Sequence, residues 1–365
     1  MRSNLGHTRT PLWGWMSTPL TGNGQTMPTL PRARGPLSAA LIADLRGETT
    51  LVDRTPPDPA PLGSGDEELA LWLLYELHHR GFDDAVDGGT EHEWRPDLLA
   101  LRGDLERRLE QRWRERVAAA DLPELPVGAE PADLSRAFFA LCEADTGAES
   151  VARFVQREAD EEQLAEVLRQ RSIYHVKEQD AAMWTLPRLP DSTKTHLVTI
   201  AADEYGNGRP DDLHAQLWAR GMRACGLDAA YAAHVDDALP AVLEQNNLMS
   251  LLGLHRRLVP AALGHLAAFE VTSAVPSRRV VRGMERLGPP EPMVAYYREH
   301  MVADAVHEQL AVRDLVGSYV AEVPGSEPEI AFGAAVCLLA EAATATALLE
   351  HVRRDAETGA GEDVA

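Results

Sequence analysis

Two histidines and an aspartate line up near the C-terminal end of the sequence. His300, Asp304 and His307 occur in the stretch EHMVADAVHEQ. On an α-helix these positions fall within an arc of about 60°, so the three side chains share one face. Imidazole and carboxylate groups on a buried face are costly unless they are paired or bind a metal. The pattern therefore indicates a metal site or a solvent-exposed polar face, and partners elsewhere in the chain must decide between them.

Two other segments supply such partners. Glu178 lies in RSIYHVKEQDAAMW, and Glu204 and His214 lie in ADEYGNGRPDDLHAQLW. A straight helix would place Glu204 and His214 about 80° apart, which is poor convergence. Two glycines and a proline between them disfavour a continuous helix. We therefore expect a break that brings both side chains to one site.

The combined set consists of three carboxylates and three imidazoles. The predicted metal ligands are Glu178, Glu204, His214, His300, Asp304 and His307. In helical bundles such ligands project inward from several facing helices. This donor set suits first-row metal ions, iron in particular, with positions left open for dioxygen and substrate. The three cysteines are far apart and form no CxxC pair, so neither an iron–sulfur cluster nor a thiolate zinc site is expected.

Three further residues are candidates for hydrogen bonds to these ligands: His175, His265 and Glu270. His175 precedes Glu178 by three residues and approximately shares its helical face. His265 and Glu270 are five residues apart, which is not a same-face spacing. Since ligating imidazoles usually donate to a carboxylate or carbonyl, either residue could support the site. Hydrogen bonding in the core or helix capping explains them equally well.

Almost every long segment has helical periodicity, and β-branched runs are limited to HLVTI and RRVV. Helices are expected over residues 37–47, 66–81, 96–120, 133–144, 148–184, 191–205, 210–225, 240–252, 254–273, 290–321 and 326–354. The fold class is therefore all-α, with one helical bundle and an N-terminal helical extension packed on it. The expected boundaries are a disordered tail over 1–36, the extension over 37–145, the bundle over 146–356 and a disordered C-terminus over 357–365.

Composition narrows the range of partners. The 365 residues carry a formal charge of −22, which argues against a nucleic acid or an anionic membrane as partner. No apolar run approaches the roughly 18–20 residues that a membrane helix needs. Three cysteines without a disulfide framework fit a reducing cytoplasm. The expected partner is a small-molecule substrate, and the sequence is compatible with an external electron donor and with a homodimer.

In order and spacing the six predicted ligands resemble those of the heme-oxygenase-like diiron oxidases, also described as the iron-containing redox enzyme family. The stretches ADEYGNGRPDDLHAQLW, NLMSLLGLHRRLVPAALGHLAAFE and EHMVADAVHEQ are similar to the same family. The resemblance covers about residues 160–350, is looser near residue 75, and does not reach the first 36 residues. It implies a heme-oxygenase-like helical bundle that holds two Fe²⁺ ions and uses O2 as co-substrate.

The resemblance also implies a class of reaction. Members oxidise small amines, amino acids or acyl substrates, and N-oxygenation of an amino-acid-like amine is slightly favoured here. Desaturation and oxidative C–C cleavage are the alternatives within the family, because a fold does not fix a reaction. From another class, the chain could be a non-catalytic bundle that stores iron or binds a ligand such as haem. A haem site would leave five of the six ligands unexplained.

Overall fold

The computed structural model describes residues 27–51 and 63–362, with every side chain in these ranges except those of residues 302–306 and 355–362. Helices and their connections make up the whole described part, in which no strand occurs. The all-α class is therefore confirmed.

The first half of the chain forms helices of short to medium length. These are α1 (Pro36–Leu45), α2 (Asp66–Glu76), α3 (Pro96–Ala119), α4 (Pro131–Cys142), α5 (Val151–Arg157), α6 (Glu161–His175) and α7 (Asp180–Met183). The second half contains the remaining helices. These are α8 (Asp191–Glu204), α9 (His214–Ala224), α10 (Pro240–Leu254), α11 (Val259–Leu287), α12 (Glu291–Gln309), α13 (Gly317–Glu322) and α14 (Glu327–Glu362), with the π-helical η8 (Leu310–Val316) between α12 and α13.

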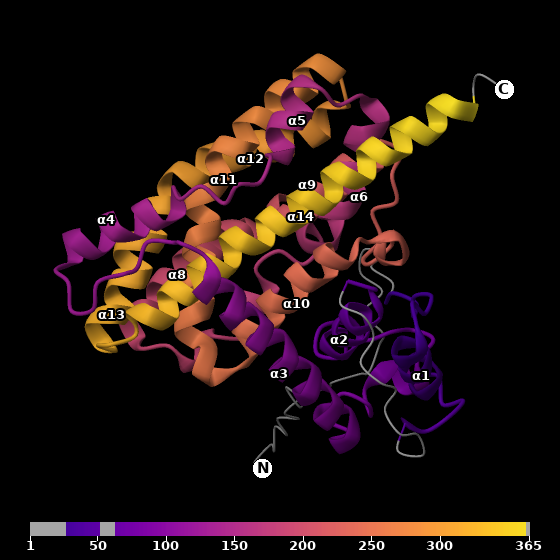
Figure 1. Cartoon of the computed structure of the whole chain (residues 1–365), viewed down its shortest axis with the longest axis horizontal. Coiled ribbons are helices and arrows are strands. Elements are labelled where there is room, and N and C mark those ends of the chain that lie inside the picture. The colour runs from indigo at the N-terminus through magenta and orange to yellow at the C-terminus, as the bar shows by residue number, and fades with distance from the viewer. Residues whose placement is uncertain (1–26, 52–62, 363–365) are drawn as a thin grey trace, which may run out of the picture.

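Helices α11 and α14 form the centre of the bundle, and α5 and α12 pack on α11. The two central helices approach at Gly264 and Gly333. A Cβ atom at Gly264 would lie 2.0 Å from the Ile330 carbonyl oxygen, and one at Gly333 would lie 1.8 Å from that of Ala261. Because only glycine tolerates such an approach, these two residues fix how the helices cross. Figure 1 shows α14, in yellow, running the length of the bundle.

Helices α1 and α2 of the N-terminal extension lie side by side at one corner of the molecule, whereas α4 lies at the other end of the bundle (Figure 1). Trp72, Leu73 and Tyr75 of α2 are almost wholly buried and belong to the same apolar core as residues of α10, α11 and α14. The extension therefore shares a core with the bundle, because its apolar helices cannot be covered without it.

Several predicted boundaries differ from the structure. Residues 148–184 form three helices, because Asp160 accepts a hydrogen bond from the Gln163 backbone and starts a new helix. The predicted N-terminal tail is too long: Leu30 is buried, and the Arg32 backbone donates to Asp236 at 2.6 Å. Residues 1–26 lie outside the described part. At the other end α14 continues to Glu362, and residues 363–365 lie outside.

Helix α11 is also longer than expected, running through Pro276 to Leu287. This corrects the membrane argument from sequence. Two helical segments, Arg256–Leu287 and Glu327–Arg354, are long and apolar enough to cross a membrane by length and composition. Their most apolar windows are 61% and 72% buried within the protein, as in the core helices of a soluble bundle.

Candidate metal centre

The break between α8 and α9 brings two distant residues together. Glu204 is the last residue of α8, and His214 is the first residue of α9. Between them Gly206 has a φ of +70°, and a Cβ there would lie 2.6 Å from the Leu213 backbone nitrogen. The chain can therefore turn back only because residue 206 is glycine. As a result, His214 Nδ1 lies 2.7 Å from Glu204 Oε2, and the predicted break is confirmed.

A first group of potential ligand atoms joins this pair to two more helices. It consists of Glu178, Glu204, His214 and His300, whose ligand atoms all lie within 4.8 Å of one another. Glu178 follows α6, and His300 projects from α12. Glu178 Oε1 and His300 Nε2 are 3.7 Å apart. All four side chains are buried.

A second group shares one of these carboxylates. Glu204, Glu270 and His307 also have ligand atoms within 4.8 Å of one another. His307 Nδ1 lies 3.6 Å from Glu204 Oε1 and 3.4 Å from Glu270 Oε2. Glu204 therefore places one carboxylate oxygen near each group, Oε2 near His214 and Oε1 near His307, so this residue joins the two groups.

The structure thus brings together five of the six predicted ligands: Glu178, Glu204, His214, His300 and His307. The side chain of Asp304 lies outside the described residues, although its backbone belongs to α12. Metal ligation by all six residues stays a prediction.

Glu270 was predicted to support the site, yet it stands in the second group beside the predicted ligands. The five-residue spacing from His265 was a poor guide, because His265 belongs elsewhere. A better sequence signal is that Glu270 is the only acidic residue in the apolar stretch VPAALGHLAAFEVTSAV of α11. A carboxylate inside an apolar helix needs a partner, and here the partner comes from α12.

Hydrogen bonds orient the two α12 imidazoles. His300 Nδ1 lies 2.9 Å from the Tyr296 carbonyl oxygen, so Nδ1 carries the proton and Nε2 faces the first group. His307 Nε2 lies 3.0 Å from Asp203 Oδ2, which leaves Nδ1 facing the second group. Metal-ligating histidines typically donate their other ring nitrogen in this way. Asp203, adjacent to Glu204 in sequence, therefore serves as an orienting carboxylate.

The donor atoms fit a metal because they are buried and unsatisfied. Four of them are buried without a hydrogen bond in the described part of the chain: Glu204 Oε2, His214 Nδ1, His300 Nε2 and His307 Nδ1. Unpaired buried polar atoms are rare in native proteins, and each costs free energy. Bound cations would supply the partner that these converging atoms lack, so the residues present fit a metal centre.

Electrostatics lead to the same conclusion. Burial lowers the pKa of His300, but the Glu178 carboxylate outweighs burial and raises that pKa to about 10. Burial likewise opposes the charged form of His307, and Glu270 with Asp203 raises its pKa to about 9. In the metal-free protein both imidazoles are therefore positively charged at neutral pH, and they balance the negative charge of the carboxylates. A bound cation would take over that balancing charge.

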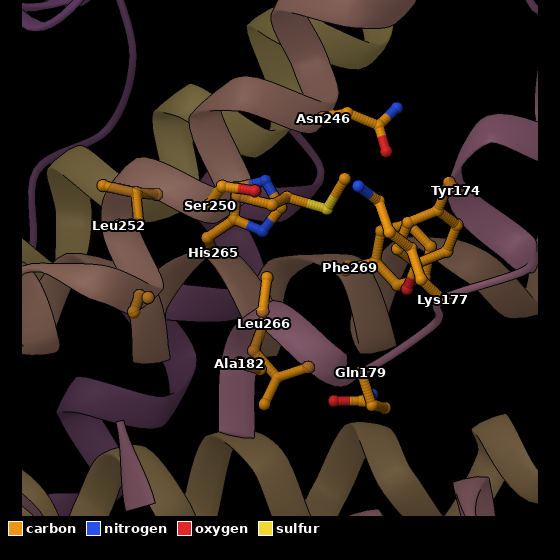
Figure 2. A pocket seen from close by; sticks show the side chains of 14 residues that line it. Tyr174, Lys177, Gln179, Ala182, Asn246, Ser250, Leu252, His265, Leu266 and Phe269 are labelled. Atoms are coloured by element: carbon orange, nitrogen blue, oxygen red, sulfur yellow. The ribbon is translucent and has the colours of Figure 1, made fainter. Parts of the chain in front are cut away.

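The other two candidates for a supporting role lie in different places. His175 Nδ1 is 2.8 Å from the Tyr296 hydroxyl and 3.5 Å from Glu178 Oε1, so it contacts the first group. His265 lines a separate cavity of about 50 Å³, where Figure 2 shows it beside Ser250 and Leu252. Burial lowers the pKa of His265 to about 4, and this imidazole is neutral.

A larger cavity opens against the first group. It has a volume of about 440 Å³ and is lined by His175, Glu178, Tyr296 and His300, among others. Its walls combine apolar side chains from α6, α11 and α14 with the ion pair of Arg171 and Glu341. A pocket of this size is large enough for a small organic molecule next to the candidate metal centre.

Comparison with known proteins agrees with this geometry. Residues 165–342 match the family described as iron-containing redox enzyme. This part of the chain belongs to that family. The heme-oxygenase-like fold expected from the sequence is therefore confirmed for residues 165–342. This part of the chain contains every residue of both ligand groups. No curated protein matches the chain. Helices α1 to α4 lie outside the matched region.

Proposed function

We propose that the chain is a non-haem diiron oxidase or oxygenase that uses O2 to oxidise a small amine, amino acid or acyl substrate. One observation carries the proposal: Glu204 belongs to both ligand groups, and the large cavity adjoins the first of them. Glu178, His214 and His300 would hold one ion, Glu270 and His307 the other, and Glu204 would bridge them. Iron bound there would supply electrons for the reduction of dioxygen, which side chains alone cannot do.

The protein's own contribution is to orient and enclose the substrate. The Tyr296 hydroxyl donates to Glu178 Oε2 at 3.1 Å and lies against His175, so this ligand cannot swing into the cavity. The surrounding aromatic side chains of Trp218 and Tyr297 exclude water from that side. The substrate would therefore meet a fixed carboxylate in a dry pocket.

Charged groups in the cavity favour an amine or amino acid over a plain acyl chain. Arg171 and Glu341 form an ion pair on the cavity wall, and 28% and 39% of their side-chain surface remains accessible. A molecule bound in the cavity would therefore meet both charged groups. Glu341 also accepts a hydrogen bond from Gln245 at 3.0 Å. The Glu341 carboxylate can bind an ammonium group of the substrate, and the Arg171 guanidinium can bind a carboxylate group of the substrate.

N-oxygenation of an amino-acid-like amine is therefore the favoured reaction, with desaturation or oxidative C–C cleavage as the alternatives. A non-catalytic iron-binding bundle would need no cavity beside its ligands, so the 440 Å³ pocket argues for the enzyme. Three free cysteines, two of them buried, support a reducing cytoplasmic location. For an oxygenation, an external electron donor would return the iron to the ferrous state between turnovers.

Anaerobic titration followed by mixing with O2 tests the proposal. We expect two ferrous ions per chain, rapid O2 consumption and a transient long-wavelength absorption. A Soret band would indicate haem instead, and iron binding without O2 consumption would indicate storage. Equal turnover with zinc would rule out redox chemistry. L-lysine, hexylamine and decanoate, supplied in parallel, then distinguish amino acid, amine and acyl substrates by which of them accelerates O2 consumption.

A further inference from the structure

The segment that carries Glu178 is held in an unusual conformation. It joins α6 to α7, and its residues Lys177, Glu178 and Gln179 are all buried. Gln179 has a φ of +70°, a left-handed conformation that non-glycine residues seldom adopt. Such a conformation persists only when the surroundings determine it strongly. Contacts on both sides of Glu178 therefore decide where its carboxylate points.

One of these contacts comes from the N-terminal extension. Glu76, on α2, is completely buried and forms an ion pair with the Lys177 ammonium group. The second carboxylate oxygen of Glu76 accepts a hydrogen bond from the Tyr231 hydroxyl at 2.7 Å. The Lys177 ammonium also lies 5.5 Å from the centre of the Trp72 ring. Residue 177 is thus fixed from two positions on α2.

The contact on the other side comes from the metal centre. The side-chain amide of Gln179 donates to Glu270 Oε1 at 3.5 Å. Lys177 and Gln179, which precede and follow Glu178 in the sequence, line the same small cavity (Figure 2). Glu178 therefore sits between an anchor in α2 and an anchor in α11.

We propose that Glu76 is a positioning residue for the metal centre, and that the N-terminal extension sets the place of Glu178 through the ion pair with Lys177. This inference rests on the proposed function, in which Glu178 is an iron ligand. The extension lies outside the region that matches the iron-containing redox enzymes, so the pair ties an added element to the shared site. A buried ion pair is weak evidence for stabilisation by itself, so the two roles have to be separated by experiment.

Glu76→Gln tests the proposal, and the chain offers a matched control. Glu106, on α3 of the same extension, is also a buried carboxylate that accepts a tyrosine hydroxyl, from Tyr75 at 3.0 Å. Its other partners are His255 and Arg102, not the Glu178 segment. Glu106→Gln therefore perturbs the extension to a similar degree without touching Lys177.

Ferrous affinity is measured anaerobically by competition with a chelator, and thermal midpoints show the stability of each variant. We expect Glu76→Gln to lower the affinity for one of the two ferrous ions about tenfold. This is the usual effect of removing a residue that positions a metal ligand. The Mössbauer signal of that ion should change, while the other ion keeps its signal. Glu106→Gln should bind iron as the wild type does. Equal iron affinity in the two variants would overturn the proposal.

A double variant separates positioning from simple stabilisation. Glu76→Gln with Lys177→Met removes both charges, so no unpaired charge is left in the core. Under the proposal the double variant regains stability but not iron affinity, because the ion pair that positions residue 177 is still missing. Recovery of wild-type iron affinity would show that the pair only stabilises the fold. Glu76→Asp keeps the carboxylate and should restore part of the affinity.

Crystal structures of the metal-free variants give a readout that needs no iron. In Glu76→Gln the distance between Glu178 Oε1 and His300 Nε2 should lengthen from 3.7 Å, and in Glu106→Gln it should not. If the wild type bound no iron, the proposed function would fail, and these distances would still decide the positioning role. An unchanged distance in Glu76→Gln would contradict the proposal directly.

Discussion

His214 Nδ1 and Glu204 Oε2 face each other at 2.7 Å across a helix break, and both side chains are buried. Both residues belong to the first ligand group. The same carboxylate also lies 3.6 Å from His307. Glu204 is therefore the residue on which both halves of the candidate centre depend, and variants of its neighbours should have separable effects.

Replacing Glu204 should lower the number of bound ferrous ions more than replacing Glu270 does. Glu204→Gln removes a carboxylate common to both groups, so both ferrous ions should be lost. Glu270→Gln removes a member of the second group only, and one ion should remain. Anaerobic titration with ferrous iron gives the stoichiometry of each variant. Loss of a single ion in both variants would contradict the bridging role of Glu204.

His307→Ala should lower the iron stoichiometry and abolish O2 consumption while leaving helicity nearly unchanged. The reason is that His307 Nδ1 faces two carboxylates of the second group and has no other partner among the described residues. His265→Ala is the matched control, since this buried histidine lies in the separate small cavity. Circular dichroism and iron analysis provide the measurement. Wild-type iron loading in His307→Ala would exclude this residue as a ligand.

Iron affinity should rise with pH between about 6 and 9. Because the pKa values of His300 and His307 are raised to about 10 and about 9, both imidazoles must lose a proton before they bind a cation. The metal-free protein should show the opposite trend. A raised folded-state pKa stabilises the fold fully below the unfolded value near 6.5, and this contribution is lost as the pH rises through 9 to 10.

Two measurements check the pH dependence. Iron titration in weakly buffered solution should release protons, and the thermal midpoint of the metal-free protein should fall from pH 7 to pH 10. His300→Gln should flatten the second trend, because its side chain does not titrate. A proton release of zero at pH 7 would mean that the imidazoles are already neutral without metal.

Gly206→Ala should damage the centre, whereas Gly208→Ala should not. Both glycines have positive φ, which costs an alanine roughly 1–2 kcal/mol. Only at residue 206 would the new Cβ also meet the backbone, at 2.6 Å from Asp212 and Leu213, while residue 208 has nothing within 4 Å. Gly206→Ala should therefore be the less stable variant and bind iron more weakly. Urea unfolding and iron titration of the pair make the comparison.

The features that could be predicted from sequence are those set by local geometry. The shared face of His300 and His307 follows from helical periodicity, and the break before His214 follows from glycine and proline chemistry. The role of Glu270 depends on how α11 packs against α12, which no local pattern contains. The same holds for Leu30, whose burial depends on partners far along the chain. The orienting contact of Asp203 with His307 also needed the structure, because it depends on how α8 lies against α12.

The crossing of α11 and α14 at Gly264 and Gly333 has a consequence for how this chain can diversify. These contacts are between backbones, so they set the depth of Glu270 in the bundle independently of the side chains around the cavity. Residues on the cavity wall, such as Val280 and Leu338, can then be exchanged without shifting that carboxylate. We expect that new substrates can be accommodated by reshaping this wall, while the chemistry at the ligands stays the same.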